Sequence, residues 1–179
     1  MFKEQVNRVL GLFFAGIVGI LIMTSCVTDD DPEKSRSLTV GDSLPAFIVE
    51  LNTGETVSDI SLRGKTSMIV FFNTSCMDCR EELPVIQSLY EIYKDDEDVA
   101  ILAISRSQSV SSVQEYWNEN NLTIPFSAQD DDKVYLKFAS ALIPRIYIAD
   151  GVGYITAAYD DNPLPGLSQL QHSILSASR

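Results

Sequence analysis

Two cysteines separated by two residues, Cys76 and Cys79, are the residues of this sequence best suited to chemistry. They follow an apolar run, Met68–Phe72, that is typical of a strand buried on both faces, and they precede apolar residues at helical spacing. At the N-terminus of a helix, unpaired N–H groups and the helix dipole favour a thiolate at Cys76. Cys79, one turn further in, can close a disulfide ring with it. The pair is therefore expected to exchange thiols with disulfides, one sulfur attacking and the other resolving the mixed disulfide.

Three other interpretations of the pair are open at this point. A zinc site needs about four ligands, but the chain has a single histidine, His172, and no second cysteine pair. An inert structural disulfide usually joins distant segments, whereas these cysteines are neighbours. Coincidence is the third, and the position between a strand and a helix argues against it. The lone histidine also disfavours Ser-His-Asp and Cys-His catalysis.

Composition limits the remaining function classes. The chain has 179 residues, enough for one domain and a short extension, and its 45% hydrophobic content is that of a globular protein. There are 13 Lys and Arg against 25 Asp and Glu, a formal net charge of −12. Such a surface repels phosphate backbones, so we expect no nucleic-acid partner.

The N-terminus is typical of a secretory signal. Met1–Arg8 is polar with net positive charge, and Val9–Met23 is an apolar run of 15 residues. Met23–Cys26 resembles a bacterial lipobox, in which the cysteine becomes the lipidated first residue. We therefore predict a lipoprotein signal peptide over residues 1–25 with lipidation at Cys26. An uncleaved anchor helix is the alternative, although the run is short for a span of about 20 residues.

Residues 26–38 are polar and contain a proline, which predicts a flexible acidic tether to a domain at 39–179. In that domain, alternating strand and helix patterns predict an α/β fold with a central mixed sheet. Strands are expected at 46–51, 56–57, 68–72, 99–104, 125–128, 145–149 and 153–158, and helices over 83–93, 110–121, 132–139 and 167–175.

From about Val40 onward the chain resembles the thioredoxin-fold thiol–disulfide oxidoreductases of the bacterial envelope, the TlpA-like branch of the redoxin families. Three motifs besides the cysteine spacing carry the resemblance: Val40–Phe47, Leu62–Lys65 and Cys79–Pro84. The resemblance implies a thioredoxin-like fold with central mixed sheet flanked by helices, N-terminal extra strands and a TlpA-type central insertion around Val110–Ala139.

The same resemblance implies a role for Ile143 and Pro144, which precede a predicted strand. They match the family's cis-proline loop, which faces the cysteine pair across the fold. The backbone of Ile143 would then pair with an extended substrate peptide beside Cys76. Arg145 stands where threonine is common in the family, which leaves substrate preference open.

Residues around the pair depart from the family pattern and are expected to tune its redox properties. Ser75 replaces the usual tryptophan and uncovers the first cysteine, and the intervening dipeptide is Met77-Asp78, without proline. Asp78 and Glu82 place negative charge near the sulfurs and disfavour a thiolate, whereas Arg80 opposes this. A less stabilised thiolate favours the disulfide, and hence a reductant.

These observations predict a membrane-anchored extracytoplasmic thiol–disulfide oxidoreductase that reduces protein disulfides, with Cys76 as nucleophile and Cys79 as resolver. Its partners would be protein thiol or disulfide substrates, a membrane or periplasmic thiol electron donor, and the membrane itself through the lipid anchor. It would lie in the bacterial cell envelope, facing the periplasm or at the cell surface. No cofactor or metal is expected beyond the redox-active disulfide.

Two further functions are weighed against this one. A thiol peroxidase of the peroxiredoxin class carries Pro-x-x-x-Thr/Ser-x-x-Cys, but the corresponding positions here are Ile69 and Asn73. A non-catalytic surface lipoprotein could use the fold as a binding module and keep the cysteines without cycling them.

Overall fold

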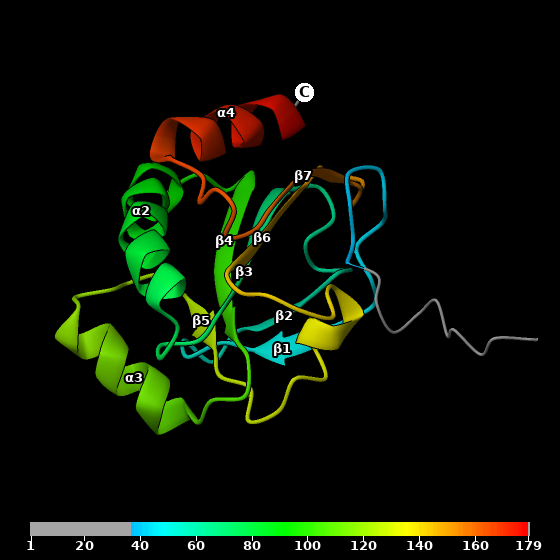
Figure 1. Ribbon diagram of the computed structural model, residues 1–179. Helices are drawn as coiled ribbons and strands as arrows, with labels where there is room; N and C mark the ends of the chain where they lie inside the picture. Colours follow the sequence, from blue (N-terminus) through cyan, green and yellow to red (C-terminus); the bar gives the residue numbers. More distant parts are fainter. Residues whose placement is uncertain (1–36, 179) are drawn as a thin grey trace, which may run out of the picture. The chain divides into compact units, whose positions relative to one another are not determined.

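A five-stranded mixed sheet organises residues 37–178, the part of the chain that the computed structural model describes (Figure 1). The strand order is β5-β4-β3-β6-β7, in which β4 is parallel to both β3 and β5, β6 is antiparallel to β3, and β7 is antiparallel to β6. β1 and β2 form a separate antiparallel hairpin. The elements are β1 Ile48–Glu50, β2 Thr56–Ser58, β3 Thr66–Phe72, α2 Met77–Tyr93, β4 Val99–Ser105, α3 Val110–Glu119, β5 Phe126–Ser127, η1 Tyr135–Lys137, β6 Arg145–Ala149, β7 Ile155–Tyr159 and α4 Leu167–Ala177.

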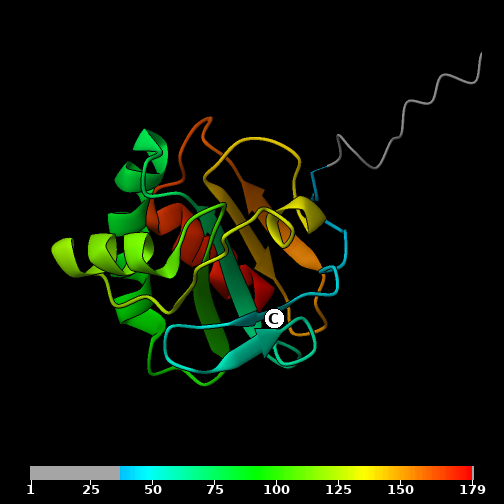
Figure 2. The same cartoon turned by 90° about the horizontal axis from the view of Figure 1, so that it is seen from below.

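The central strand β3 is buried along its whole length and divides the core into two layers. Because successive side chains of a strand point to opposite faces, Met68, Val70 and Phe72 pack against α2, α3 and α4. Ile69 and Phe71 pack on the other face, against the hairpin β1–β2 and the segment around η1. Figure 2 shows α2 and η1 on opposite sides of the sheet. The end of β3 therefore leads into α2 from the middle of a rigid core.

The expected α/β architecture is confirmed, including the mixed sheet and the extra N-terminal strands. One element differs: the predicted helix over 132–139 is only the single 3₁₀ turn η1. The carbonyl oxygen of Phe138 accepts hydrogen bonds from the Leu38 N–H (2.8 Å) and from the hydroxyl of Tyr147 (3.1 Å). The carbonyl oxygen of Phe138, which a longer helix would use in its own backbone hydrogen bonds, is thus bonded to distant segments.

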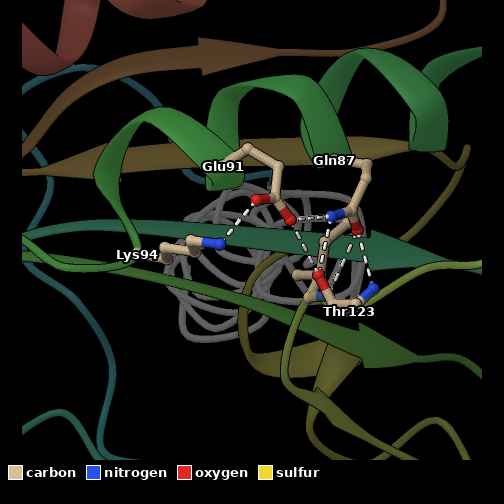
Figure 3. Close-up of polar contacts among 5 residues, drawn as sticks. Gln87, Glu91, Lys94 and Thr123 are labelled. Atoms are coloured by element: carbon tan, nitrogen blue, oxygen red, sulfur yellow. Dashed lines mark hydrogen bonds and ion pairs between the residues drawn. The ribbon is translucent and has the colours of Figure 1, made fainter.

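The insertion that carries α3 is fastened to α2 by a polar cluster, shown in Figure 3. The side-chain oxygen of Gln87 accepts from the N–H groups of Thr123 (2.8 Å) and Ile124 (3.2 Å), and its amide nitrogen donates to the Thr123 hydroxyl (2.7 Å). Glu91 accepts from Gln87 and Thr123 and pairs with Lys94 at 2.7 Å. Neighbouring Trp117 donates to the Ile124 carbonyl at 2.9 Å. The insertion is thereby tied to the helix that begins at the cysteines.

The predictions for the N-terminal region, including the signal peptide and Cys26, lie outside the described residues. Among residues 37–178, none of the helices combines the length and apolar character needed to cross a bilayer.

Candidate active site

The two cysteines lie where β3 ends and α2 begins. Cys76 is the N-cap residue of α2, and its Sγ accepts a hydrogen bond from the backbone N–H of Cys79 at 3.4 Å. The loop before it is closed by Asn73, whose carbonyl accepts from the Cys76 N–H (3.0 Å) and whose side-chain oxygen accepts from the Ser75 N–H (2.9 Å). A buried strand followed by a capped turn thus fixes the first sulfur at the positive end of the helix dipole.

The two thiols differ sharply in their surroundings. Cys79 is fully buried, with 0% of its surface exposed, whereas Cys76 is half-buried and can be reached from solvent. Burial, followed by the hydrogen bond with Cys76, raises the pKa of Cys79 well above its ordinary value. A reagent or client therefore meets Cys76 first, and Cys79 stays protonated until it is needed. This asymmetry agrees with the expected roles, Cys76 as the nucleophile and Cys79 as the resolving thiol.

The loop that contains Ile143 and Pro144 lies against the first cysteine. The Ile143–Pro144 peptide bond is cis. The thiol of Cys76 donates to the carbonyl oxygen of Ile143, with Sγ and oxygen 3.5 Å apart. Cys76 and Ile143 are 67 positions apart in the sequence. They meet because β3 and β6 are neighbours in the sheet.

The other residues expected to tune the pair occupy different positions around it. Ser75, Met77 and Asp78 are exposed, Met77 at 81%, so they form the surface around Cys76. The guanidinium of Arg80 lies over the ring of Tyr116 on α3, 5.4 Å from its centroid. Arg80 is thus engaged in a cation–π contact with the insertion.

Glu82 is buried, with 2% of its surface exposed, and its Oε1 has no hydrogen-bond partner among the described residues. Burial, assisted by the charge of Glu81, raises its pKa to about 7. From the sequence, Glu82 is expected to place negative charge near the sulfurs. That expectation is corrected here, because near neutral pH a large fraction of this carboxyl carries a proton. Glu82 lies three residues after Cys79, on the same buried side of α2.

Two residues that the sequence did not single out, Gln108 and Tyr135, support the site. Gln108 bonds to Thr74, in the loop before Cys76, through both atoms of its side-chain amide (2.7 Å each). The hydroxyl of Tyr135 donates to the Leu142 carbonyl at 2.7 Å.

Arg145, noted in the sequence only as a departure from the family, donates from its guanidinium to the Ala141 carbonyl at 3.2 and 3.3 Å. It also pairs with Asp160 at 3.4 Å. The sequence does not reveal the ion pair with Asp160, because the two residues meet only where β7 pairs with β6.

No cluster of metal-ligating side chains occurs within residues 37–178.

Comparison with known proteins places this geometry among thiol–disulfide oxidoreductases. The chain is 27% identical over 159 residues to thiol-disulfide oxidoreductase ResA of Oceanobacillus iheyensis, covering 86% of this chain and 82% of that protein. It is 24% identical over 144 residues to ResA of Bacillus thuringiensis, covering 80% of each. A solution structure from Bacteroides thetaiotaomicron, proposed to be a protein disulfide isomerase, is 26% identical with a TM-score of 0.69, over 79% of this chain and 91% of that one.

The chain combines an accessible cysteine and a buried one with a thioredoxin-like fold. It is a thiol–disulfide oxidoreductase of the thioredoxin-like class. This chain belongs to the AhpC/TSA family, which it matches over residues 40–158. The sequence-based expectation of a redoxin with a thioredoxin-like fold is confirmed.

Proposed function

We propose that this enzyme reduces disulfides of protein clients outside the cytoplasm while anchored to a membrane. The observation that carries the proposal is the asymmetry of the pair, a reachable Cys76 above a buried Cys79 of raised pKa. The names of the ResA relatives support thiol–disulfide exchange as the reaction. The peroxidase motif is not matched, since Ile69 stands at its proline position and Asn73 at its threonine or serine position.

In the proposed reaction the Cys76 thiolate attacks one sulfur of the client disulfide. The client S–S bond breaks, a Cys76–client mixed disulfide forms, and the first client sulfur leaves as a thiolate that takes up a proton. Cys79 then loses its proton and attacks Sγ of Cys76, which releases the second client thiol. The enzyme ends as the Cys76–Cys79 disulfide, two electrons having passed to the client. A membrane or periplasmic thiol donor returns the pair to the reduced state.

The backbone around Ile143 would hold the client during this exchange. Its carbonyl oxygen already lies 3.5 Å from Sγ of Cys76. An extended client segment pairing with this backbone would bring its own sulfur next to Cys76, in the manner of an added strand.

The reduction potential of the reduced full-length chain tests the direction of the reaction. An enzyme that reduces client disulfides needs a low potential, so we expect a value near or below ~−250 mV, in the range of reducing thioredoxins. Equilibration against a dithiothreitol series, followed by alkylation of free thiols, measures it. A value near ~−120 mV would instead indicate an oxidant.

The anchoring part of the proposal assigns residues 1–25 to a signal peptide, 26–38 to a tether and Cys26 to lipidation. Expressed in a bacterial host, the wild-type chain is expected in the membrane fraction with lipid attached. Cys26→Ala is expected to lose the lipid, and labelled fatty acid with membrane fractionation measures both. Cys76→Ala is the matched control, since it removes a cysteine without touching the anchor, and lipid retained by Cys26→Ala would contradict the assignment.

A further inference from the structure

Cys76 is bordered by two segments that belong to different parts of the chain. One is the loop that precedes it, residues 73–76, and the other is the proline loop, residues 140–144. A third segment, Arg106–Gln108, follows β4. It is hydrogen-bonded to the first loop and packs on Tyr135, which is hydrogen-bonded to the second. We call Arg106–Gln108 the frame segment.

The frame segment holds the cysteine loop through three side-chain hydrogen bonds. The side-chain oxygen of Gln108 accepts from the Thr74 N–H, and its amide nitrogen donates to the Thr74 hydroxyl, both at 2.7 Å. The side-chain amide of Asn73 donates to the carbonyl of Arg106 at 2.9 Å. A backbone bond from the Arg106 N–H to the Phe72 carbonyl, at 2.8 Å, extends the pairing of β4 with β3 to this point. The loop that ends in Cys76 is thereby fixed along most of its length.

The frame segment reaches the proline loop through Tyr135. The guanidinium of Arg106 lies 4.4 Å from the centroid of the Tyr135 ring. The Tyr135 hydroxyl in turn donates to the Leu142 carbonyl at 2.7 Å. Leu142 precedes Ile143, whose carbonyl faces the Cys76 thiol. A continuous series of contacts therefore links the loop before Cys76 to the proline loop, by way of the frame segment and Tyr135.

The insertion keeps the frame segment itself in place. The Ser107 N–H donates to the Asp131 carbonyl (3.1 Å), and the Gln108 N–H donates to the Gln129 carbonyl (2.7 Å). Ser107 and Leu142 have φ angles of 53° and 70°. Side chains other than glycine rarely adopt this left-handed region, and such residues gather at functional sites where their surroundings hold them.

We propose that Gln108 and Tyr135 are positioning residues that set the spacing between Cys76 and the proline loop, so that a client backbone and the nucleophile are presented together. The inference rests on the thiol–disulfide exchange proposed above and deepens it. It gives the central insertion a function, since Tyr135 and the carbonyls that hold the frame segment all come from it. Neither residue touches the reacting sulfurs. Their effect acts through the loops that they hold.

The test compares two disulfides that differ in whether they need the proline loop. The reduced full-length chain is mixed with 4,4′-dithiodipyridine, which offers no backbone to bind, and with a short peptide whose cysteine is joined to thionitrobenzoate. In the second reaction Cys76 attacks the peptide sulfur, the Cys76–peptide disulfide forms, and thionitrobenzoate leaves with the electron pair. Both leaving groups absorb visible or near-ultraviolet light, so both second-order rates are read directly.

For Gln108→Ala we expect the peptide rate to fall about tenfold while the small-molecule rate stays within about twofold, since misplaced groups slow an oriented reaction more than an unoriented one. Tyr135→Phe keeps the ring over Arg106 and removes only the hydroxyl. It should also lower the ratio of the peptide rate to the small-molecule rate. Gln108→Glu keeps an acceptor for the Thr74 N–H and should restore most of the ratio. Gln114→Ala and Tyr154→Phe, an α3 surface amide and an exposed tyrosine, are the matched controls and should leave it unchanged.

Equal losses with both disulfides would overturn the inference, because a merely structural role slows both reactions alike. An unchanged ratio in Gln108→Ala and Tyr135→Phe would overturn it as well. The proposed function is judged separately, by reduction of a protein disulfide such as insulin by the wild-type chain with a thiol donor. A wild type that reacts with both probes but does not reduce insulin would refute the proposed function and leave the comparison of the two rates intact.

Discussion

Replacing Cys79 with alanine is expected to leave the enzyme covalently attached to its client through Cys76. The first half of the reaction needs only the reachable thiol of Cys76, whereas release of the client needs the second thiol, one turn further into α2. Turnover should therefore fall to background, a loss on the order of 1,000-fold or more, because the two sulfurs act as a unit. Non-reducing electrophoresis after incubation with a protein disulfide shows the adduct as a band that dithiothreitol removes.

Cys76→Ala is the matched control, since it removes the same side chain from the other position. It should lose turnover equally but form no adduct, because the remaining Cys79 is fully buried. Circular dichroism of both variants verifies that α2 still forms. Normal turnover by Cys79→Ala, or an adduct formed by Cys76→Ala instead, would reverse the assignment of the two roles.

The sequence predicted the parts of the site that depend on local pattern. The apolar run at 68–72 fixed β3, and the cysteine spacing at its end placed Cys76 at the start of α2, both as observed. The position of Pro144 beside the pair came from family resemblance, because nothing local distinguishes it from a loop proline. The first two of these predictions concern the backbone path, which hydrophobic periodicity and capping largely determine.

What the sequence did not predict depends on side chains that meet across the fold. Gln108 and Thr74 are 34 positions apart and come together because β3 and β4 are parallel neighbours. The charge state of Glu82 depends on burial between packed elements, which its acidic type alone does not disclose. Both features lie next to Cys76 or Cys79. The residues proposed to position and tune the site are therefore those whose contacts arise only in the folded chain.

Glu82→Gln is expected to slow the step in which Cys79 resolves the mixed disulfide. Cys79 must lose its proton in a place where burial holds that proton tightly. Residues three apart on a helix are neighbours, with Cβ atoms about 5–6 Å apart, and Glu82 is the buried acid at that distance in sequence. Its pKa of about 7 suits a proton acceptor near neutral pH. Glutamine has the same shape but cannot accept the proton, so we expect resolution to slow on the order of 100-fold.

The same substitution is expected to change how stability depends on pH. Between about pH 4.5 and 7 the unfolded chain ionises Glu82 while the folded chain keeps it protonated, so the free energy of unfolding of the wild type falls as pH rises. The shift from 4.5 to about 7 corresponds to roughly 3 kcal/mol before solvent screening reduces it. Glu82→Gln should therefore be more stable than the wild type at about pH 8, by on the order of 1–2 kcal/mol in denaturant titrations.

Stability and resolution move in opposite directions in Glu82→Gln, and this opposition separates a proton acceptor from a packing residue. Single-turnover resolution of a preformed mixed disulfide, followed from about pH 5 to 9, should rise through pH 7 in the wild type and lose that rise in the variant. Glu81→Gln changes the exposed neighbouring carboxyl and should keep the pH profile, with at most a small displacement, because Glu81 is the lesser cause of the raised pKa. If Glu82→Gln gains stability yet resolves the mixed disulfide at the wild-type rate, Glu82 affects only the stability of the fold and is not the proton acceptor. A buried carboxyl oxygen without a hydrogen-bond partner, as Oε1 of Glu82 is within residues 37–178, destabilises the fold, and a role as proton acceptor would explain why it is kept.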